Sequence, residues 1–325
     1  METSNWMASL DKNISLGSLH LPGTHNSAAA KKIKISQTPN IEHSTGLNVL
    51  RHLSWLPGVK FFTKKWVLTQ SKTVAEQLEF GIRAFDFRIL YNPSDEQLYL
   101  SHSFILGKLE PVLQEIRDFM DAHPNEIIVL RIRPDFEHED ITANHHDKAY
   151  DLIESYLKDL LITTTAPKNY KLDEDKFKIG HLQAANERIL LIYQDCPDKK
   201  SKPSVWGEKV LDTHWANEST AAEVVEDFKD KSNADEICVS IMKESNTAVT
   251  PDARSIVRNT AKSFFSLGLY RPYGLKKEAS KSNEGMLAFL KENPDYQEAT
   301  NFISMDFPSN SNVEDVIESN RSLKP

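Results

Sequence analysis

The stretch GIRAFDFRIL (Gly81 to Leu90) has the pattern of a β-strand whose apolar run is interrupted by two charged residues. Asp86 and Arg88 flank Phe87, so they point to the same face of such a strand. Charged side chains are costly to bury without partners. The stretch therefore predicts either an ion pair between Asp86 and Arg88 or a polar centre that several strands build together.

Short apolar runs of this kind recur along the chain, and amphipathic stretches with helical spacing lie between them. Residues 108–124 and 148–161 have the helical spacing. This alternation, without an obvious linker, favours an α/β fold with a single domain, a distorted (β/α)8 TIM-like barrel, over a doubly wound open sheet. The other runs are ISLGSLHLPG (14–23), QLYLSH (97–102), EIIVLRIRP (126–134), RILLIYQD (188–195), EICVSIM (236–242) and NFISMDFP (301–308).

Polar residues at the ends of these runs are the candidates for a functional site. In a (β/α) barrel, the loops at the carboxyl ends of the strands converge on one face and carry the functional groups. A shared polar centre at that face would also explain why charged residues interrupt apolar strands. The residues predicted to converge there are His25, Asp86, Arg88, His102, Arg133 and Asp306.

Composition and charge exclude several classes of protein. The chain has 325 residues and a formal net charge of −8, which provides no basic stripe for nucleic-acid phosphates. Two cysteines, Cys196 and Cys238, cannot form a disulfide framework or a four-thiolate zinc site. No Sec-type signal and no apolar run near 18 residues is present. The expected location is cytoplasmic, or exported without a Sec signal, with peripheral membrane contact.

Four motifs in order carry a resemblance to a known family: PGTHNS (22–27), TVAEQLEFGIRAFDFRI (73–89), LYLSHS (98–103) and HPNEIIVLRIRPDFE (123–137). They resemble the successive boxes of the phosphatidylinositol-specific phospholipase C X domain, and the opening segment is most similar to the branch that consists of the X domain alone. The resemblance implies one barrel domain over residues 1–325, with X-box motifs at about 5–140, further barrel strands at about 141–310, and a C-terminal tail at 311–325.

The resemblance also implies a phospholipase C reaction that gives diacylglycerol and inositol 1,2-cyclic phosphate. Two imidazoles on opposite sides of a phosphorus can perform it, because one accepts a proton while the other donates one. A guanidinium fork matches phosphate oxygens and stabilises the transition state. By matching motif positions, His25 is the general base, His102 the general acid, Arg88 the phosphate ligand with Asp86 beside it, Arg133 a phosphate or inositol ligand, and Asp306 the partner of His25.

Two of these positions bear on metal dependence. Calcium-dependent relatives carry acidic residues at the positions of both Asp86 and Arg88 and a glutamate at Arg133, so no cofactor is expected and calcium is the less favoured alternative. Asn26 departs from the aspartate of many metal-independent relatives. It can accept a hydrogen bond from His102 but adds no charge. This leaves slower turnover, a different acid partner or a residual metal requirement open; Asn26 and Asp86 would then be the metal ligands.

Other segments are predicted to lie at the substrate or the membrane. Trp215 is a candidate inositol contact. In FEHEDITANHHDK (136–148), adjacent histidines lack the spacing of a helical zinc site, which favours a solvated charged loop. Residues 51–66 have the composition of a surface for anionic membranes, and the alternative is a hairpin that buries its aromatic residues. The predicted membrane-contact residues are Trp55, Phe61, Phe62, Lys64, Lys65 and Trp66.

Two other functions remain compatible with the sequence. A metal-dependent phosphodiesterase of the glycerophosphodiester or sphingomyelin type also uses two barrel histidines, but it requires an acidic metal pair where this chain has Asp86 and Arg88. A catalytically weakened module that binds a lipid or an inositol phosphate is compatible with Asn26. Sensitivity to EDTA distinguishes the first alternative, and binding that survives His25→Ala without any activity distinguishes the second.

Overall fold

The computed structural model describes residues 2–30, 67–102, 105–134, 143–163, 175–197, 201–207, 210–232, 242–250 and 275–323. The predicted membrane-contact stretch at 51–66 lies outside these residues, and so does most of the strand predicted at 236–242. Within the described residues, no helix is both long enough and apolar enough to cross a membrane.

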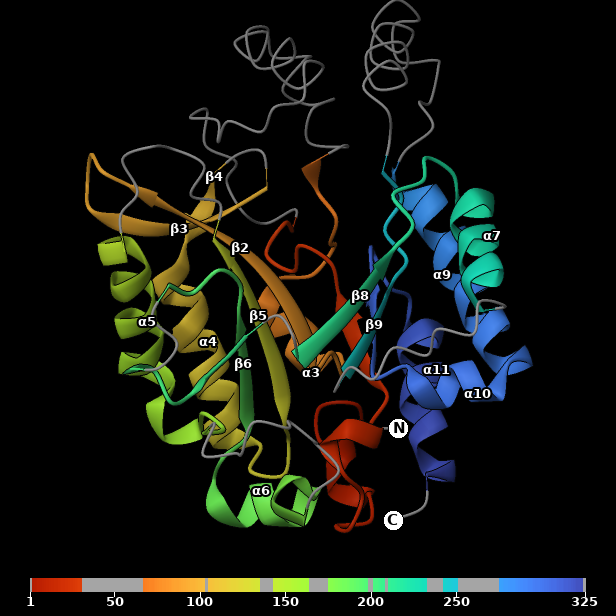
Figure 1. Cartoon of the computed structure of the whole chain (residues 1–325), viewed down its shortest axis with the longest axis horizontal. Coiled ribbons are helices and arrows are strands. Elements are labelled where there is room, and N and C mark those ends of the chain that lie inside the picture. Colours follow the sequence, from red (N-terminus) through yellow and green to blue (C-terminus); the bar gives the residue numbers. More distant parts are fainter. Residues whose placement is uncertain are drawn as a thin grey trace, which may run out of the picture.

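One curled parallel sheet forms the centre of the molecule (Figure 1). Its strands follow the order β7-β6-β5-β2-β1-β10-β9-β8, and no ladder among the described residues joins β7 to β8. The predicted distorted α/β barrel is therefore confirmed, with an opening between these two strands. The strands are β1 Leu21–Thr24, β2 Ala84–Asn92, β5 Ile128–Pro134, β6 Ile189–Tyr193, β7 Val205–Trp206, β8 Leu211–Trp215, β9 Met242–Asn246 and β10 Phe302–Met305.

An antiparallel extension lengthens the sheet at β2. Strand β3 (Gln97–Ser101) pairs with the second half of β2, and β4 (Ile105–Lys108) pairs with β3. The sequence pattern predicted β3 as a strand of a largely parallel sheet, but its pairing with β2 is antiparallel. The pattern did not predict β4, β7 or β8, because β7 has only two residues and only one residue of β8 is buried.

Helices cover the outside of the sheet, with α4 and α5 on one side and α7, α9 and α11 on the other (Figure 1). The predicted helices at 108–124 and 148–161 correspond to α4 and α5. Because α5 begins at Ala143, the loop predicted around His145 and His146 is wrong for residues 143–148. Residues 311–319, predicted as part of a tail, belong to α11, which contacts β1. The helices are α3 Val74–Glu79, α4 Leu109–Ala122, α5 Ala143–Leu157, α6 Ile179–Ala185, α7 Ala221–Ser232, α9 Leu275–Glu292, α10 Pro294–Ala299 and α11 Asn310–Ser319.

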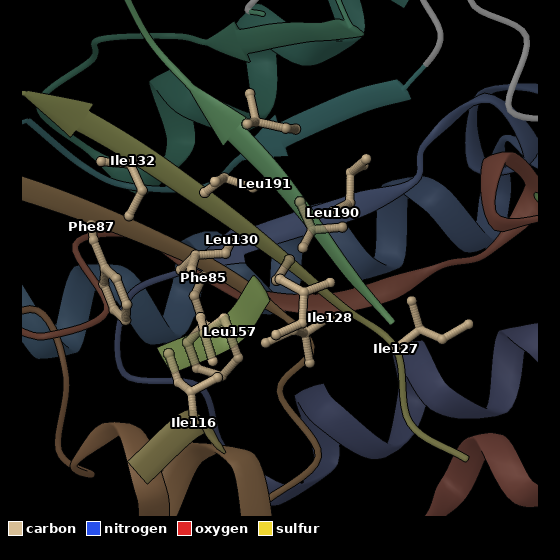
Figure 2. Packing of buried hydrophobic residues seen from close by; sticks show 14 of the residues in the cluster. Phe85, Phe87, Ile116, Ile127, Ile128, Leu130, Ile132, Leu157, Leu190 and Leu191 are labelled. Atoms are coloured by element: carbon tan, nitrogen blue, oxygen red, sulfur yellow. The ribbon is translucent and has the colours of Figure 1, made fainter. Parts of the chain in front are cut away.

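The two faces of the sheet differ in chemistry. Phe85 and Phe87 of β2 are buried in the core that also contains Ile116 of α4 and Leu157 of α5 (Figure 2). Because side chains alternate along a strand, Asp86 and Arg88 point to the opposite face, into the barrel. Arg131 and Arg133 of β5 stand in register with them on the same face. Apolar packing outside the sheet thus directs four charged side chains inward.

A buried ion pair lies beside the beginning of β2. Arg83, immediately before β2, places Nε 2.6 Å from Glu126 Oε2, and both side chains are fully buried. Glu126 Oε1 also accepts a hydrogen bond from the backbone N–H of Met7, at 2.9 Å. The pair therefore links the first residues of the chain to the beginning of β2 and to the segment that leads into β5.

His20 joins the start of β1 to the end of α11. Its backbone N–H donates to Asn320 Oδ1 at 2.8 Å, and its ring Nδ1 lies 2.8 Å from Ser319 Oγ. Burial lowers the pKa of His20 from 6.5 to about 4, because the interior disfavours the charged imidazolium. The folded protein consequently binds fewer protons than the unfolded chain between these two pH values.

We expect His20 to make the protein less stable as the pH falls from about 6.5 to about 4, because protons then bind preferentially to the unfolded state. The shift corresponds to about 3 kcal/mol of unfolding free energy. Denaturant titrations at several pH values should therefore show a shallower pH dependence for His20→Asn. His123→Asn, which replaces a half-buried histidine, is the control. Parallel curves for wild type and His20→Asn would contradict this account.

Candidate active site

The backbone at His25 is held firmly where β1 ends. The N–H of His25 donates to the carbonyl of Met305 at 3.2 Å, which extends the pairing of β1 with β10 by one residue. Gln70 Nε2 donates to the carbonyls of His25 and Met305, at 2.8 and 2.9 Å. Thr69 Oγ1 donates to the His25 carbonyl as well, at 3.2 Å. These contacts fix the direction in which the His25 side chain leaves the sheet.

Both ring nitrogens of His25 have partners. Nδ1 lies 3.1 Å from Asp306 Oδ1, and Nε2 lies 2.9 Å from Asn26 Nδ2. An amide nitrogen only donates, so Nε2 is the acceptor and Nδ1 carries the hydrogen that is donated to Asp306. This arrangement is the neutral tautomer whose basic nitrogen is Nε2.

Asp306 follows β10 and is buried at the same end of the barrel. Asn283 of α9 donates from Nδ2 to the Asp306 carbonyl at 2.9 Å, which fixes this residue from the helical layer. Burial raises the pKa of the Asp306 carboxyl above its usual value, and the nearby His25 opposes that rise.

Asp86 receives its hydrogen bonds from the next strand and from the loop after β1. Its Oδ2 accepts the backbone N–H of Asn26 at 3.0 Å and pairs with Arg133 Nη2. Burial alone would raise the pKa of Asp86, but the positive charges of Arg133 and Arg131, together with His25, hold it well below its usual value. Within the described part of the chain, the other oxygen, Oδ1, has no hydrogen-bond partner.

The partner of Asp86 is therefore Arg133 of β5 and not its strand neighbour Arg88. The Cα of Arg88 stands opposite that of Arg133 in the parallel ladder, two residues closer to the carboxyl end than Asp86. Arg133 Nη2 also lies 3.5 Å from Asn26 Oδ1. The loop residue Asn26, at a left-handed φ of 42° that asparagine tolerates, thus contacts both His25 and Arg133.

His102 lies beside His25 and approaches from the antiparallel extension. It follows β3, and the centres of the two imidazole rings are 6.2 Å apart at an interplanar angle of 78°. His102 Nδ1 lies 2.6 Å from the carbonyl of Val67, so this nitrogen is the donor. Two imidazoles held in complementary orientations can serve one small group as base and acid.

Trp215 lies at the carboxyl end of β8, in register with Asn246 of β9. It is the large apolar side chain that stands out as exposed among the described residues, with 41% of its surface accessible. Since all eight strands of the main path are parallel, their carboxyl ends share one rim, so Trp215 belongs to the same end of the barrel as His25.

A second group of polar residues, which the sequence pattern did not predict, lies deeper in the barrel. Arg131 Nη1 of β5 lies 2.8 Å from Glu244 Oε2 of β9. Arg131 and Arg133 lie on either side of Ile132 in sequence and so point to the same face. The alternation that singled out Asp86 and Arg88 could therefore have identified Arg131. No comparable pattern was available for Glu244, because its short strand MKESN lacks an apolar centre. Gln70, Thr69 and Asn283 were also missed, since they act through backbone contacts.

The side chains of Asn26 and Asp86 do not form a site that fits a divalent cation. Calcium requires six to eight oxygen ligands. Here Asn26 Oδ1 and Asp86 Oδ2 both contact the guanidinium of Arg133, whose positive charge would oppose a metal ion between them. Among the described residues, no group of three or more histidine, cysteine, aspartate or glutamate side chains is arranged to hold a metal.

The chain is similar to known proteins both in sequence and in structure. The family model described as PI-PLC X 1 matches residues 58–209. PI-PLC X domain-containing protein 2 from Homo sapiens is 29% identical over 264 residues, which cover 78% of this chain and 80% of the relative. PI-PLC X domain-containing protein 3 from Homo sapiens is 26% identical over 267 residues, covering 80% and 78%.

Solved bacterial structures share the fold at low identity. The phosphatidylinositol-specific phospholipase C from Listeria monocytogenes has a TM-score of 0.63 at 17% identity and covers 99% of this chain and 100% of its own. The phosphatidylinositol-specific phospholipase C from S. aureus also has a TM-score of 0.63 at 17% identity, with 98% of each chain covered. The barrel architecture described above is thus the fold of these proteins.

We expect Gln70→Ala to lower the unfolding free energy by about 1–3 kcal/mol, because two buried carbonyls each lose one hydrogen bond. Urea unfolding measures this change. Gln114→Ala is the matched control, since the exposed Gln114 amide donates to Asp118 on its own helix, at 2.7 Å, with no other partner among the residues that the structure describes. Equal stability of the two variants would mean that the Gln70 contacts contribute nothing to holding β1 against β10.

Proposed function

Because the chain belongs to the phosphatidylinositol-specific phospholipase C X-domain family, we propose that it is a phospholipase C-type phosphodiesterase. Its substrate would be phosphatidylinositol or a related inositol phospholipid, cleaved to diacylglycerol and inositol 1,2-cyclic phosphate. The observation that carries the proposal is the pair of imidazoles 6.2 Å apart, one of which is held by Asp306 with its basic nitrogen at Nε2.

In the first half of the reaction, His25 acts as general base. Its Nε2 takes the proton of the inositol 2-hydroxyl, whose oxygen attacks phosphorus as the cyclic ester forms. The hydroxyl must replace the Asn26 amide, which lies 2.9 Å from Nε2. The imidazolium that results keeps its contact with the Asp306 carboxyl, 3.1 Å from Nδ1, and this opposite charge stabilises it.

In the second half, His102 acts as general acid. Its Nδ1 donates to the Val67 carbonyl, so the proton proposed to go to the diacylglycerol oxygen, as the bond from that oxygen to phosphorus breaks, comes from Nε2. One proton enters at His25 and one leaves at His102. The net reaction requires no water until the cyclic product is released, and proton exchange with solvent restores both histidines.

The arginines have different tasks in this proposal. Arg133 is bound to Asp86 and Asn26, so it holds the loop after β1 in place and contributes positive charge at the phosphate. Arg88 stands opposite Arg133 on the same inner face, two residues nearer the carboxyl end than Asp86, which supports its assignment as the phosphate ligand. Trp215 at the rim is proposed to contact the inositol ring, and Asp86 keeps the arginine charges in balance.

The same geometry favours a reaction without metal over the metal-dependent phosphodiesterase. The position between Asn26 and Asp86 holds a guanidinium, which supplies a fixed positive charge beside the phosphate. We also propose peripheral contact with anionic membranes through residues 51–66, on the basis of their composition alone.

We expect His25→Ala and His102→Ala each to reduce turnover by about 10²–10⁴-fold, because each removes one of the two proton transfers. Phosphorus NMR of phosphatidylinositol in mixed micelles follows the cyclic product directly. His123→Ala is the control, since His123 stacks on Phe119 at the end of α4, close to the amino-terminal end of β5. Full activity of either site variant would refute its assigned role.

If wild type binds the micelles without releasing any product, the chain is a binding module for this lipid. Binding by His25→Ala would then match that of wild type, because no chemistry is lost. If other inositol phospholipids are cleaved instead, the reaction holds and the headgroup differs.

Turnover should be the same within about twofold in EDTA and in excess calcium, since the Arg133 guanidinium occupies the place of a cation. The same NMR assay measures both conditions. Loss of activity in EDTA that calcium restores would favour the metal-dependent alternative, with Asn26 and Asp86 as ligands.

A further inference from the structure

The Arg131–Glu244 pair spans the interior of the barrel. Arg131 lies on β5 and Glu244 on β9, and three strands, β2, β1 and β10, separate them along the sheet. Their side chains nevertheless meet at 2.8 Å, with the Glu244 side chain 1% and the Arg131 side chain 14% exposed. The contact therefore connects opposite walls of the barrel and not neighbouring strands.

Among the residues that the structure describes, the Glu244 carboxylate accepts every hydrogen bond that it makes. Oε2 accepts from Arg131 and from Thr213 Oγ1, the latter at 2.9 Å, and Oε1 accepts from Ser304 Oγ at 2.5 Å. An amide at this position would lose the negative charge that pairs with Arg131, and its N–H group would require a hydroxyl to accept instead of donate. The site is thus built for a carboxylate, and its three partners come from three different strands, β5, β8 and β10.

Two chains of interactions lead from Glu244 toward the two ring nitrogens of His25. On one side, Arg131 stands in register with Asp86 on the same inner face, so its positive charge acts on that carboxylate. Asp86 accepts the backbone N–H of Asn26, and the Asn26 amide lies on Nε2. On the other side, Ser304 lies two residues before Asp306, whose carboxylate holds Nδ1. Both chains begin at the same carboxylate.

We propose that Glu244 is a positioning residue that holds Asn26 and Asp306, the partners of the two His25 ring nitrogens, in a fixed arrangement relative to each other. This inference rests on the proposed function, because it assigns Glu244 a role in the reaction that His25 performs. Glu244 touches no reacting atom. It fixes the separation between β10, which carries Asp306, and β5, which carries the arginines, and hence the tautomer and direction of the imidazole.

The Arg83–Glu126 pair provides a matched comparison within the same chain. It is also a buried arginine–glutamate contact, at 2.6 Å. Its glutamate accepts from two donors, Arg83 and the Met7 N–H, where Glu244 accepts from three. It lies at the amino-terminal end of β2, whereas His25 follows the carboxyl end of the adjacent β1. Glu126→Gln therefore reports what the loss of a buried ion pair does to stability alone.

The test compares Glu244→Gln with Glu126→Gln in the full-length protein. We expect Glu244→Gln to lower kcat by roughly 10- to 100-fold with KM changed by less than about threefold, since a misdirected base costs rate and not substrate contact. Glu126→Gln should lower the Tm and leave kcat unchanged. If Glu244→Gln does not fold, Ser304→Ala removes one of its hydrogen bonds and should lower kcat by several-fold.

A second readout does not depend on turnover. Nitrogen-15 NMR of the histidine side chains reports which ring nitrogen carries the proton. Wild type and Glu126→Gln should show His25 as a single tautomer protonated at Nδ1, whereas Glu244→Gln, or Ser304→Ala in its place, should show a mixture. If wild type proves inactive on every lipid tested, the proposed function fails, and the tautomer measurement still decides the positioning role.

Two results would overturn the inference. One is a Glu244→Gln variant, or Ser304→Ala in its place, that has wild-type kcat and a single His25 tautomer. The other is a Glu126→Gln variant that loses as much kcat as Glu244→Gln, since the loss would then follow from general destabilisation. A double variant, Glu244→Gln with Ser304→Ala, should be little worse than Glu244→Gln alone, because the two residues act through one chain of contacts.

Discussion

The ion pair between Asp86 and Arg133 is the contact on which the arrangement at the carboxyl end of the barrel depends. Asp86 is 3% exposed, and a carboxylate removed from water to that extent needs a close opposite charge. Loss of one member of such a pair costs about 3–5 kcal/mol, because the other charge stays buried. With the pair intact, Asp86 can hold the backbone of Asn26, and the loop that carries His25 follows from it.

Charge balance in the barrel interior explains why these residues occur together. Arg88, Arg131 and Arg133 point inward from adjacent strands, and Asp86, Glu244 and Asp306 provide the opposing carboxylates. Hydrogen bonds between ionised groups are roughly twice as strong as those between neutral groups. A barrel filled in this way has fixed positive charge that would meet the proposed anionic substrate without reorganisation, which is the form of electrostatic stabilisation that contributes most to catalysis in general.

The two histidines lie side by side in space but belong to different parts of the fold, because His102 follows the antiparallel extension formed by β3 and β4. His25 belongs to the parallel sheet and is fixed by β10, whereas His102 belongs to the extension and is oriented by Val67, a residue far from it in sequence. The proposed base and the proposed acid are therefore held by independent elements. Such independence allows their directions to differ, as the angle of 78° between the rings requires.

The sequence by itself determined the type of fold, the faces of the strands and the identity of the residues that meet at one rim. Strand alternation is a local property, so the inward direction of Asp86 and Arg88 followed from Phe85 and Phe87 alone. The position of His25 and Asp306 after apolar runs placed them at the carboxyl ends in the same way. Three features could not be predicted from the sequence: the antiparallel direction of β3, the helical conformation of the first residues of α5, and the helix α11. Pairing direction and helix docking depend on partners that are distant in the chain.

Only the tertiary structure decided which of these groups are partners. Asp86 pairs with Arg133 and not with Arg88, because the register of β2 against β5 brings Arg133 within reach. The contact of Asn26 with His25 depends on a left-handed turn, and that of Glu244 with Arg131 depends on the curvature that closes the barrel. Alternation assigns a side chain to a face. Register, curvature and loop conformation, which arise between segments far apart in the chain, select the atom that it meets.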